Sequence, residues 1–260
     1  MSEGLSHVLT TGRLQVEGRI AQASNAAFLC RLDGTALRCI YKPLRGERPL
    51  WDFPSATLGH REVAAYELSR LAGWDVVPTT VWRDDGPFGP GTCQQWIEST
   101  GEQKLVEIIP ADWSRPGWHD IVEGETTDGA AVRLVHADRV ELQQIALLDA
   151  VANNADRKGG HVLVDSGGHV WAIDHGVCFH AEHKLRTVLW GWAGAPIDDS
   201  ARQVLSHLAA TLESPNGTAV HRWLADEESA ALAARIERLL ESARFPEPTL
   251  DWPMIPWPVL

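Results

Sequence analysis

Hydrophobic and polar positions alternate along much of the first third of the chain, the period of two that is typical of strands. A stretch of small residues, 18–26, separates two such segments, and Asp33-Gly34 is a strong hairpin signal. The small-residue stretch therefore predicts a tight turn between the first two strands. Strands are expected within 13–42 and at 76–82 and 93–97.

A period near 3.6 replaces this alternation at 59–73, where Gly73 is a good helix C-cap. Residues 99–135 are mixed and polar, and indicate an insertion or a hairpin with linkers. Further helices are expected at 137–153, 198–213 and 226–243, and short strands at 162–165 and 169–173. The tail, 246–260, holds five of the fifteen prolines and is expected to be irregular.

Strands thus precede about residue 98, and helices follow about residue 136. This segregation predicts an α+β fold of two lobes. The mainly β lobe is expected at 1–98 and the mainly α lobe at 99–260.

Composition narrows the possible partners. The 260 residues carry a formal net charge of -12 and no long basic run, which argues against a nucleic-acid partner and against an anionic membrane surface. No stretch approaches the roughly 20 apolar residues of a membrane span. The four cysteines are scattered and no signal peptide is apparent, so we expect reduced thiols and a cytoplasmic protein. Most of the twelve tryptophans are expected in the core, with Trp252 and Trp257 clamping the tail onto the body.

The most informative stretch is 149–176. Asp156-Arg157 follows a helical run, His161 comes soon after, and Asp174-His175-Gly176 follows the second of two short apolar strands. Two carboxylates delivered in this way can converge on one point. Phosphoryl transfer needs this layout, with one acid to orient a nucleophile and another to hold a divalent metal on a nucleotide.

Two residues upstream fit the same chemistry. Lys42 ends an apolar strand, where an ammonium can pair with nucleotide phosphates, and Glu62 lies on the helix at 59–73. Each has a plainer reading by itself, as a solvated strand end or an exposed helix carboxylate. The turn at 18–26 can bring backbone N–H groups close to phosphates, although most such turns are simple hairpins.

The order of these features resembles the atypical kinases. It is similar to the phosphatidylinositol 3-/4-kinase superfamily and to its relatives, the Golgi casein kinases and the HipA-type toxin kinases. The helix and strand beginning at Glu62 resemble the Golgi kinases, and Asp149-x4-Asn154-x-Asp156-Arg157 resembles the shared catalytic loop. The resemblance covers roughly residues 14–180 and implies a bilobal protein-kinase-like fold, with ATP and Mg²⁺ or Mn²⁺ as cofactors.

The resemblance also implies roles. Lys42 would contact the α and β phosphates, with Glu62 holding Lys42 or binding a metal. Asp156 would orient or deprotonate the acceptor hydroxyl, Arg157 would steady the loop, and Asp174 would bind the metal. Adenine would stack against a hinge, and the phosphates would be covered by the small-residue turn. The expected hinge residues are Gln95, Trp96 and Ile97, and the expected covering residues are Ser24 and Asn25.

One departure concerns the metal. His161 stands where lipid kinases have a metal-binding asparagine, and imidazole suits Mn²⁺ or Zn²⁺ better than Mg²⁺. His161 is therefore a candidate metal ligand that predicts altered metal preference or weak activity. Lys158 replaces the usual histidine after the Asp-Arg pair, which reduces the match to lipid kinases.

Several functions remain open from the sequence. The acceptor of a phosphotransferase would be a protein hydroxyl, a small alcohol or a lipid head group, and Lys184 and Arg186 are a thin basis for the last. The alternatives are a nucleotide-binding pseudokinase that regulates a partner, and transfer of AMP. A zinc site among the histidines of the second hairpin is conceivable but matches no metal motif; those histidines are His169, His175, His180 and His183.

Overall fold

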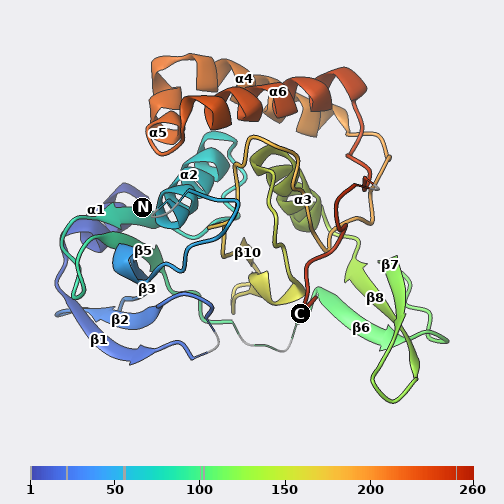
Figure 1. Cartoon of the computed structure of the whole chain (residues 1–260), viewed down its shortest axis with the longest axis horizontal. Helices are drawn as coiled ribbons and strands as arrows, with labels where there is room; N and C mark the ends of the chain where they lie inside the picture. Colours follow the sequence, from blue (N-terminus) through green and yellow to red (C-terminus); the bar gives the residue numbers. More distant parts are fainter. Residues whose placement is uncertain (1, 22, 55–56, 100, 102, 250) are drawn as a thin grey trace.

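The computed structural model describes residues 2–21, 23–54, 57–99, 101, 103–249 and 251–260 (Figure 1). A five-stranded antiparallel sheet forms one end of the molecule, and its hairpins follow the predicted alternation. In spatial order its strands are β1 (Leu14–Arg19), β2 (Phe28–Leu32), β3 (Arg38–Pro43), β5 (Gly91–Gln95) and β4 (Thr80–Arg83). The hairpin at Asp33-Gly34 is confirmed, with Gly34 at a positive φ of 71° that glycine tolerates.

One helix of this lobe was not predicted. α1 (Ser2–Thr11) places Leu9 in a small core with Tyr41 and Cys93 from the sheet. Arg83 fixes the end of this helix, because its Nη1 donates to the carbonyls of Leu9 and Gly12 at 2.8 and 2.7 Å.

The strand predicted at 76–82 is wrong in its first half, since β4 begins only at Thr80. Val76 and Val77 are buried in the larger core of the molecule instead. Pro78 has no N–H to give to a ladder, and the Val76 carbonyl accepts the Ala172 N–H at 2.7 Å, from a distant part of the chain.

Helices dominate the other half, as predicted. Figure 1 shows α4 and α6 lying together above α2 and α3. The helices of this half are α3 (Val140–Ala152), α4 (Asp199–Glu213), α5 (Thr218–His221) and α6 (Asp226–Ser242), and α2 (Leu58–Leu71) precedes them in the chain. Single 3₁₀ turns lie at Leu44–Gly46, Gly159–His161 and Pro215–Gly217.

The mixed segment at 99–135 forms most of a second antiparallel sheet. Its strands, in the order β6-β8-β7, are β6 (Val106–Pro110), β8 (Ala131–Ala137) and β7 (Trp118–Glu125). The helix predicted to begin at 137 therefore begins later, at Val140, because Ala137 still pairs with Trp118. The two short strands are confirmed as the hairpin β9 (Val162–Val164) and β10 (Val170–Ala172).

The larger hydrophobic core joins the two halves. It contains side chains of α2, such as Ala65 and Leu68, together with α3, α4 and α6. Arg61 of α2 is 1% exposed and forms an ion pair with Glu228 of α6. The division between residues 98 and 99 stays a prediction, since the core of the second half includes residues from before it.

The tail packs as expected at one of its two tryptophans. Lys184 Nζ lies 4.6 Å from the ring centroid of Trp252, whereas Trp257 is 85% exposed. Trp190 and Trp192 are buried in the core, which confirms packing as their role. All four cysteines are buried free thiols. Among the described residues, no helix is both long and apolar enough to cross a bilayer.

Candidate active site

Three charged side chains from three distant segments meet at one point. Lys42 extends from β3, Glu62 from the first half of α2, and Asp174 from the loop just after β10. Lys42 Nζ lies 2.5 Å from Glu62 Oε1 and 3.2 Å from Asp174 Oδ1. The sequence predicted these residues as one site, and the structure brings them together.

The charges in this cluster depend on one another. Burial by itself would lower the pKa of Lys42, but Asp174 and Glu62 outweigh it and raise that pKa. Lys42 in turn holds the pKa of Asp174 well below its usual range. Burial raises the pKa of Glu62, which is 3% exposed and whose Oε2 has no hydrogen-bond partner among the described residues. Lys42, Glu62 and Asp174 thus place one cationic and two acidic side chains together, an arrangement that can bind a charged ligand.

The local backbone positions Glu62 and Asp174. Glu47 caps α2, because its Oε1 accepts the Gly59 N–H at 2.8 Å, and this fixes the start of the helix that carries Glu62. Asp174 has a φ of 62°, a left-handed conformation that costs a non-glycine residue about 1 kcal/mol or more. Such strain often marks functional sites, and here it turns the carboxylate toward Lys42.

His161 lies beside the same carboxylate. Its Nε2 is 3.5 Å from Asp174 Oδ2, and its Nδ1 faces the Lys158 N–H, also at 3.5 Å. Burial lowers the pKa of His161, although Asp174 opposes this, so the ring is neutral near pH 7. With Nδ1 accepting a hydrogen bond, Nε2 carries the proton. Binding a metal through Nε2 therefore requires that proton to leave and the weak Lys158 contact to be given up.

A buried ion pair holds the loop that carries Asp156. Arg157 and Asp149 are both fully buried, and Arg157 donates to the two Asp149 oxygens at 2.8 and 2.9 Å. Arg157 also donates to the Ile173 carbonyl at 2.8 Å and lies 2.7 Å from His175 Nε2. Arg157 thus ties the Asp156 loop to the residues flanking Asp174, and it acts by position rather than by contact with the cleft.

A left-handed residue ends α3 and starts this loop. Asn153 has a φ of 54° and donates its side-chain amide to the carbonyls of His180 and Glu182 at 2.8 and 2.6 Å. Its Oδ1 accepts the Lys184 N–H. The helix end, the loop and the segment after Asp174 are therefore locked to one another by one asparagine.

Asp156 itself is partly exposed and already has a cationic partner. Lys158 Nζ lies 2.9 Å from Asp156 Oδ2, and Arg186 Nη2 lies 3.9 Å from Oδ1. The sequence did not identify Lys158 as a partner of Asp156. Spacing alone was a possible signal, because residues i and i+2 on an extended loop project to the same side.

These groups surround a cleft of about 450 Å³. The predicted phosphate-covering residues Ser24 and Asn25 line it, together with Lys42, Glu62, Asp156 and Asp174. Asn25 is fixed there by accepting the Arg48 N–H at 2.8 Å. The turn predicted at 18–26 connects β1 and β2 as expected, apart from residue 22, which lies outside the described residues.

The predicted hinge is not among the residues that line this cleft. Gln95 ends β5, Trp96 donates its N–H to the Arg38 carbonyl at 3.0 Å, and Ile97 is buried. These contacts do not test adenine binding, so the role of these three residues stays a prediction.

The histidines considered as a zinc site are held apart by other bonds. His175 is buried against Arg157, His169 bonds the Asp75 carbonyl at 3.0 Å, and His180 bonds the Asp52 carbonyl at 2.9 Å. Within the described part of the chain, no group of three or more His, Cys, Asp or Glu side chains has a metal-binding arrangement. A metal at Asp174 and His161 would need its remaining ligands from elsewhere, such as nucleotide phosphates.

Comparison with known proteins shows both a sequence relative and structural neighbours. Protein Rv2133c of Mycobacterium tuberculosis is 46% identical over 262 residues, which cover 96% of this chain and 94% of the relative. No model of a known protein family matches the chain.

Two solved structures share the fold at low sequence identity. The Golgi casein kinase with Mn and ADP bound aligns with a TM-score of 0.59 and 15% identity, over 93% of this chain and 75% of the kinase. The hydra Fam20 protein with sugar aligns with a TM-score of 0.55 and 15% identity, over 92% of this chain and 87% of that protein. The chain therefore has a kinase-like α+β fold, of the type found in the Golgi casein kinase.

Proposed function

We propose that this chain, which belongs to the same family as the mycobacterial protein Rv2133c, is an ATP-dependent phosphotransferase of the atypical kinase class. The observation that carries the proposal is the contact of Lys42 with both Glu62 and Asp174, at 2.5 and 3.2 Å, in a cleft that also exposes Asp156. A lysine, a helix glutamate and a metal-binding aspartate are parts that kinases use to hold nucleotide phosphates. The kinase-like fold supports the same reading.

In this proposal each residue has one task. Lys42 leaves Asp174 to bind the α and β phosphates while Glu62 keeps its ammonium in place. Ser24 and Asn25 cover the phosphates from the small-residue turn. Asp156 Oδ1 accepts the proton of the acceptor hydroxyl, the new O–P bond forms at the γ-phosphorus, and the bond to the β-phosphate oxygen breaks to release ADP.

A divalent cation completes the site. Asp174 would hold it, with His161 as the second protein ligand, and it would neutralise charge on the phosphates. Asp174 and His161 suit this task, because Asp174 Oδ2 and His161 Nε2 already lie 3.5 Å apart. Glu62 Oε2, which is buried without a hydrogen-bond partner among the described residues, is a further acceptor for a positive charge. The Golgi casein kinase has been crystallised with Mn and ADP bound, and we propose Mn²⁺ or Mg²⁺ here.

The acceptor is proposed to be a hydroxyl of a protein or a small alcohol. The net charge of -12 disfavours an anionic membrane surface, which makes a lipid head group the weaker choice. Lys158 and Arg186 beside Asp156 favour an acceptor that carries negative charge near its hydroxyl group.

A second candidate function is nucleotide binding without chemistry. The observation that favours it is the ion pair of Lys158 with Asp156, which occupies the carboxylate that must accept a proton. In that case the protein would regulate a partner according to its nucleotide state.

ATP turnover in an Asp156→Asn variant separates these functions. We expect the wild type to release ADP with Mg²⁺ or Mn²⁺, and the variant to be slower by about 10² to 10⁴-fold while it binds ADP equally well, because only proton transfer is lost. An Asp199→Asn variant, changed at an exposed helix position, is the matched control.

The outcomes distinguish all three activities. Equal and negligible turnover in wild type and variant, with tight nucleotide binding, would leave the pseudokinase function. Parallel reactions with α-labelled and γ-labelled ATP report which group is transferred. If label from α-labelled ATP stays on the protein or the acceptor, the reaction is AMP transfer and not phosphate transfer.

A further inference from the structure

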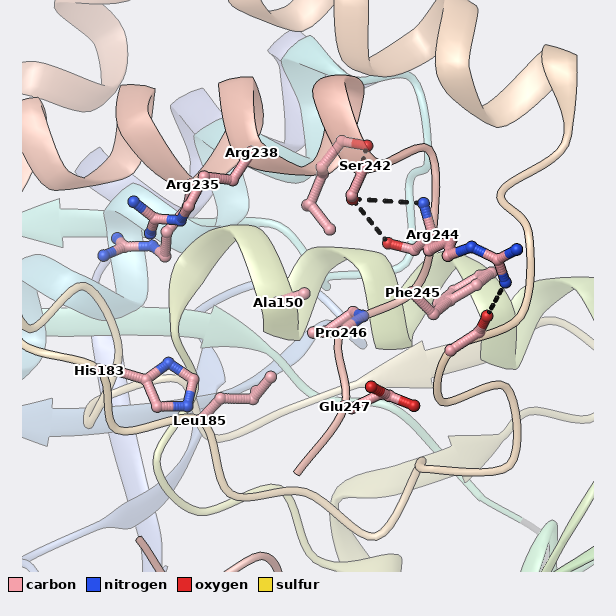
Figure 2. Close-up of a pocket in the computed structure, with 12 residues that line it drawn as sticks. Ala150, His183, Leu185, Arg235, Arg238, Ser242, Arg244, Phe245, Pro246 and Glu247 are labelled. Atoms are coloured by element: carbon pink, nitrogen blue, oxygen red, sulfur yellow. Dashed lines mark hydrogen bonds between the residues drawn. The ribbon is translucent and has the colours of Figure 1, made fainter. Parts of the chain in front are cut away.

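A second cavity, of about 580 Å³, lies away from the Lys42 cleft and shares no lining residue with it. Figure 2 shows it between α3, the end of α6 and the chain that follows α6. Its volume lies in the range of small-molecule sites. Much of its wall is apolar, formed by Ala150, Leu185, Leu239, Phe245 and Pro246.

One end of the cavity is lined by cationic or titratable side chains. In Figure 2, Arg235, Arg238 and His183 lie on the same side, and Arg244 on the other, where it donates to the Gly194 carbonyl at 2.5 Å. Arg235 and Arg238 sit three residues apart on one helix, so they project from the same face of α6. Both are close enough to His183 to oppose its protonation and lower its pKa, after the larger effect of burial.

Arg235 is the unusual member of this group, because it is 7% exposed. Its Nε donates to the Val151 carbonyl at 2.7 Å and its Nη1 to the His180 carbonyl at 3.2 Å. Its Nη2 is buried with no hydrogen-bond partner among the described residues. A buried guanidinium N–H without an acceptor is unfavourable, because its lost hydration is not replaced, and a bound anion would supply the missing acceptor.

Among the described residues, the arginines at this end of the cavity have no carboxylate of their own as a partner. Across the described ranges, neither Arg235 nor Arg238 forms an ion pair within 4.0 Å. Glu228, whose charge reaches Arg235, is already paired with Arg61. Glu247 lines the cavity at its other end, next to Gly194, where it faces away from the two arginines (Figure 2).

We propose that this cavity binds a small organic phosphate, whose head group lies between Arg235 and Arg238 beside His183 and whose apolar body packs against Leu185, Leu239 and Phe245. Two guanidinium groups match the charge and the forked geometry of a phosphate better than those of a single carboxylate. Arg238 is exposed, so its side chain can shift to admit the head group to the shielded Nη2 of Arg235. The site does not depend on the proposed kinase activity, because it shares no residue with that cleft.

Isothermal titration calorimetry with phenyl phosphate tests the site. Inorganic phosphate serves as the control for the head group alone, and phenol as the control for the apolar body alone. We expect phenyl phosphate to bind more tightly than either, and benzoate to bind more weakly, because both parts of the cavity contribute. Arg238→Glu should weaken phenyl phosphate by about 10-fold or more, since it reverses one of the two head-group charges. Arg202→Glu, at an exposed position on α4, is the matched control, and Lys42→Met reports binding at the nucleotide cleft.

Each other outcome would overturn the site. No binding at millimolar phenyl phosphate, or equal losses in Arg238→Glu and Arg202→Glu, would mean that the cavity has no specific ligand of this kind. Loss in Lys42→Met alone would move the ligand to the cleft. Hydrogen exchange locates it independently, since phenyl phosphate should protect the end of α6 and residues 183–185 but not residues 23–27.

Discussion

At the scale of single residues, the site rests on one lysine that serves two carboxylates. Glu62 is nearly fully buried, and Lys42 is its hydrogen-bonded counter-charge among the described residues. Asp174 is half exposed and can exchange Lys42 for another cation without being left unpaired in a dry environment. The Lys42–Glu62 contact is therefore structural, in addition to the role proposed for it in phosphate binding, whereas the Lys42–Asp174 contact is free to change.

Removing Lys42 should separate these two roles. We expect Lys42→Met to lower the free energy of unfolding by about 2–3 kcal/mol, because Glu62 is left buried without its counter-charge. Lys42→Met with Glu62→Gln should regain most of this stability but no nucleotide affinity. Urea unfolding and ADP titration measure the two effects. An equally unstable double variant would contradict the role given to Glu62.

Residue patterns in the sequence predicted which charged residues lie together, and left the contacts of the expected hinge open. Lys42, Glu62 and Asp174 each follow or lie on an element whose period is clear, so a resemblance in their order was enough to place them together. Gln95, Trp96 and Ile97 depend on how the two halves of the molecule pack, which no local pattern records. The spacing of Arg235 and Arg238 was visible on the predicted helix at 226–243, but their meeting with His183 was not.

At the scale of elements, a histidine attaches the β6-β8-β7 sheet to the helical half. His136 of β8 is fully buried; its Nδ1 donates to the Ala137 carbonyl and its Nε2 accepts the Gly191 N–H, both at 3.0 Å. The ring packs on Trp192, with centroids 4.6 Å apart. Burial lowers the pKa of His136 to about 4, and a protonated Nε2 could not accept the Gly191 bond.

This histidine should make the protein sensitive to mild acid. Below the ordinary histidine pKa of about 6.5, His136 binds a proton in the unfolded chain but stays neutral in the folded protein. The free energy of unfolding therefore falls as the pH drops toward 4, by about 3 kcal/mol in total. His136→Gln keeps an acceptor for Gly191 and should flatten this part of the profile. His7→Gln, at an exposed position, is the control for replacing a histidine by glutamine. Urea midpoints from pH 7.5 to 4 measure the effect, and parallel curves for all three proteins would contradict it.

The ends of the helices and strands show that hydrophobic periodicity alone predicts some elements well and others not. The patterns of α4 and α6 were strong, and their predicted ends agree closely with the structure. Val76 and Val77 are β-branched residues that favour strands, yet they lie outside any described sheet. Pro78 follows them, and their side chains are buried in the larger core instead. At such places tertiary packing decides the structure against local propensity.

At the scale of the whole molecule, α2 belongs to both halves. It carries Glu62 toward the sheet and contributes Ala65 and Leu68 to the larger core. A boundary at residue 98 therefore separates sequence patterns more cleanly than it separates cores.

A fragment of residues 99–260 should therefore not fold cooperatively. It would lack α2 and the buried Val76 and Val77, which leaves an apolar gap in the larger core and against α5. We expect the full chain to unfold in one transition, with far-UV circular dichroism and tryptophan fluorescence coinciding. A sigmoidal urea transition in the fragment would show instead that the second half is an independent domain.

The ion pair between Arg61 and Glu228 has a consequence for control of the protein. Protein kinases are switched on and off by repositioning the helix that carries the glutamate partner of the lysine. Here the residue next to Glu62 is fastened to α6, and Arg61 also donates to the Cys178 carbonyl at 2.5 Å. Moving α2 outward would separate the buried charges of Arg61 and Glu228, which costs about 3–5 kcal/mol. For the proposed kinase, switching off by displacement of α2 is therefore unfavourable, and we expect regulation to act on occupancy of the cleft or on access to Asp156.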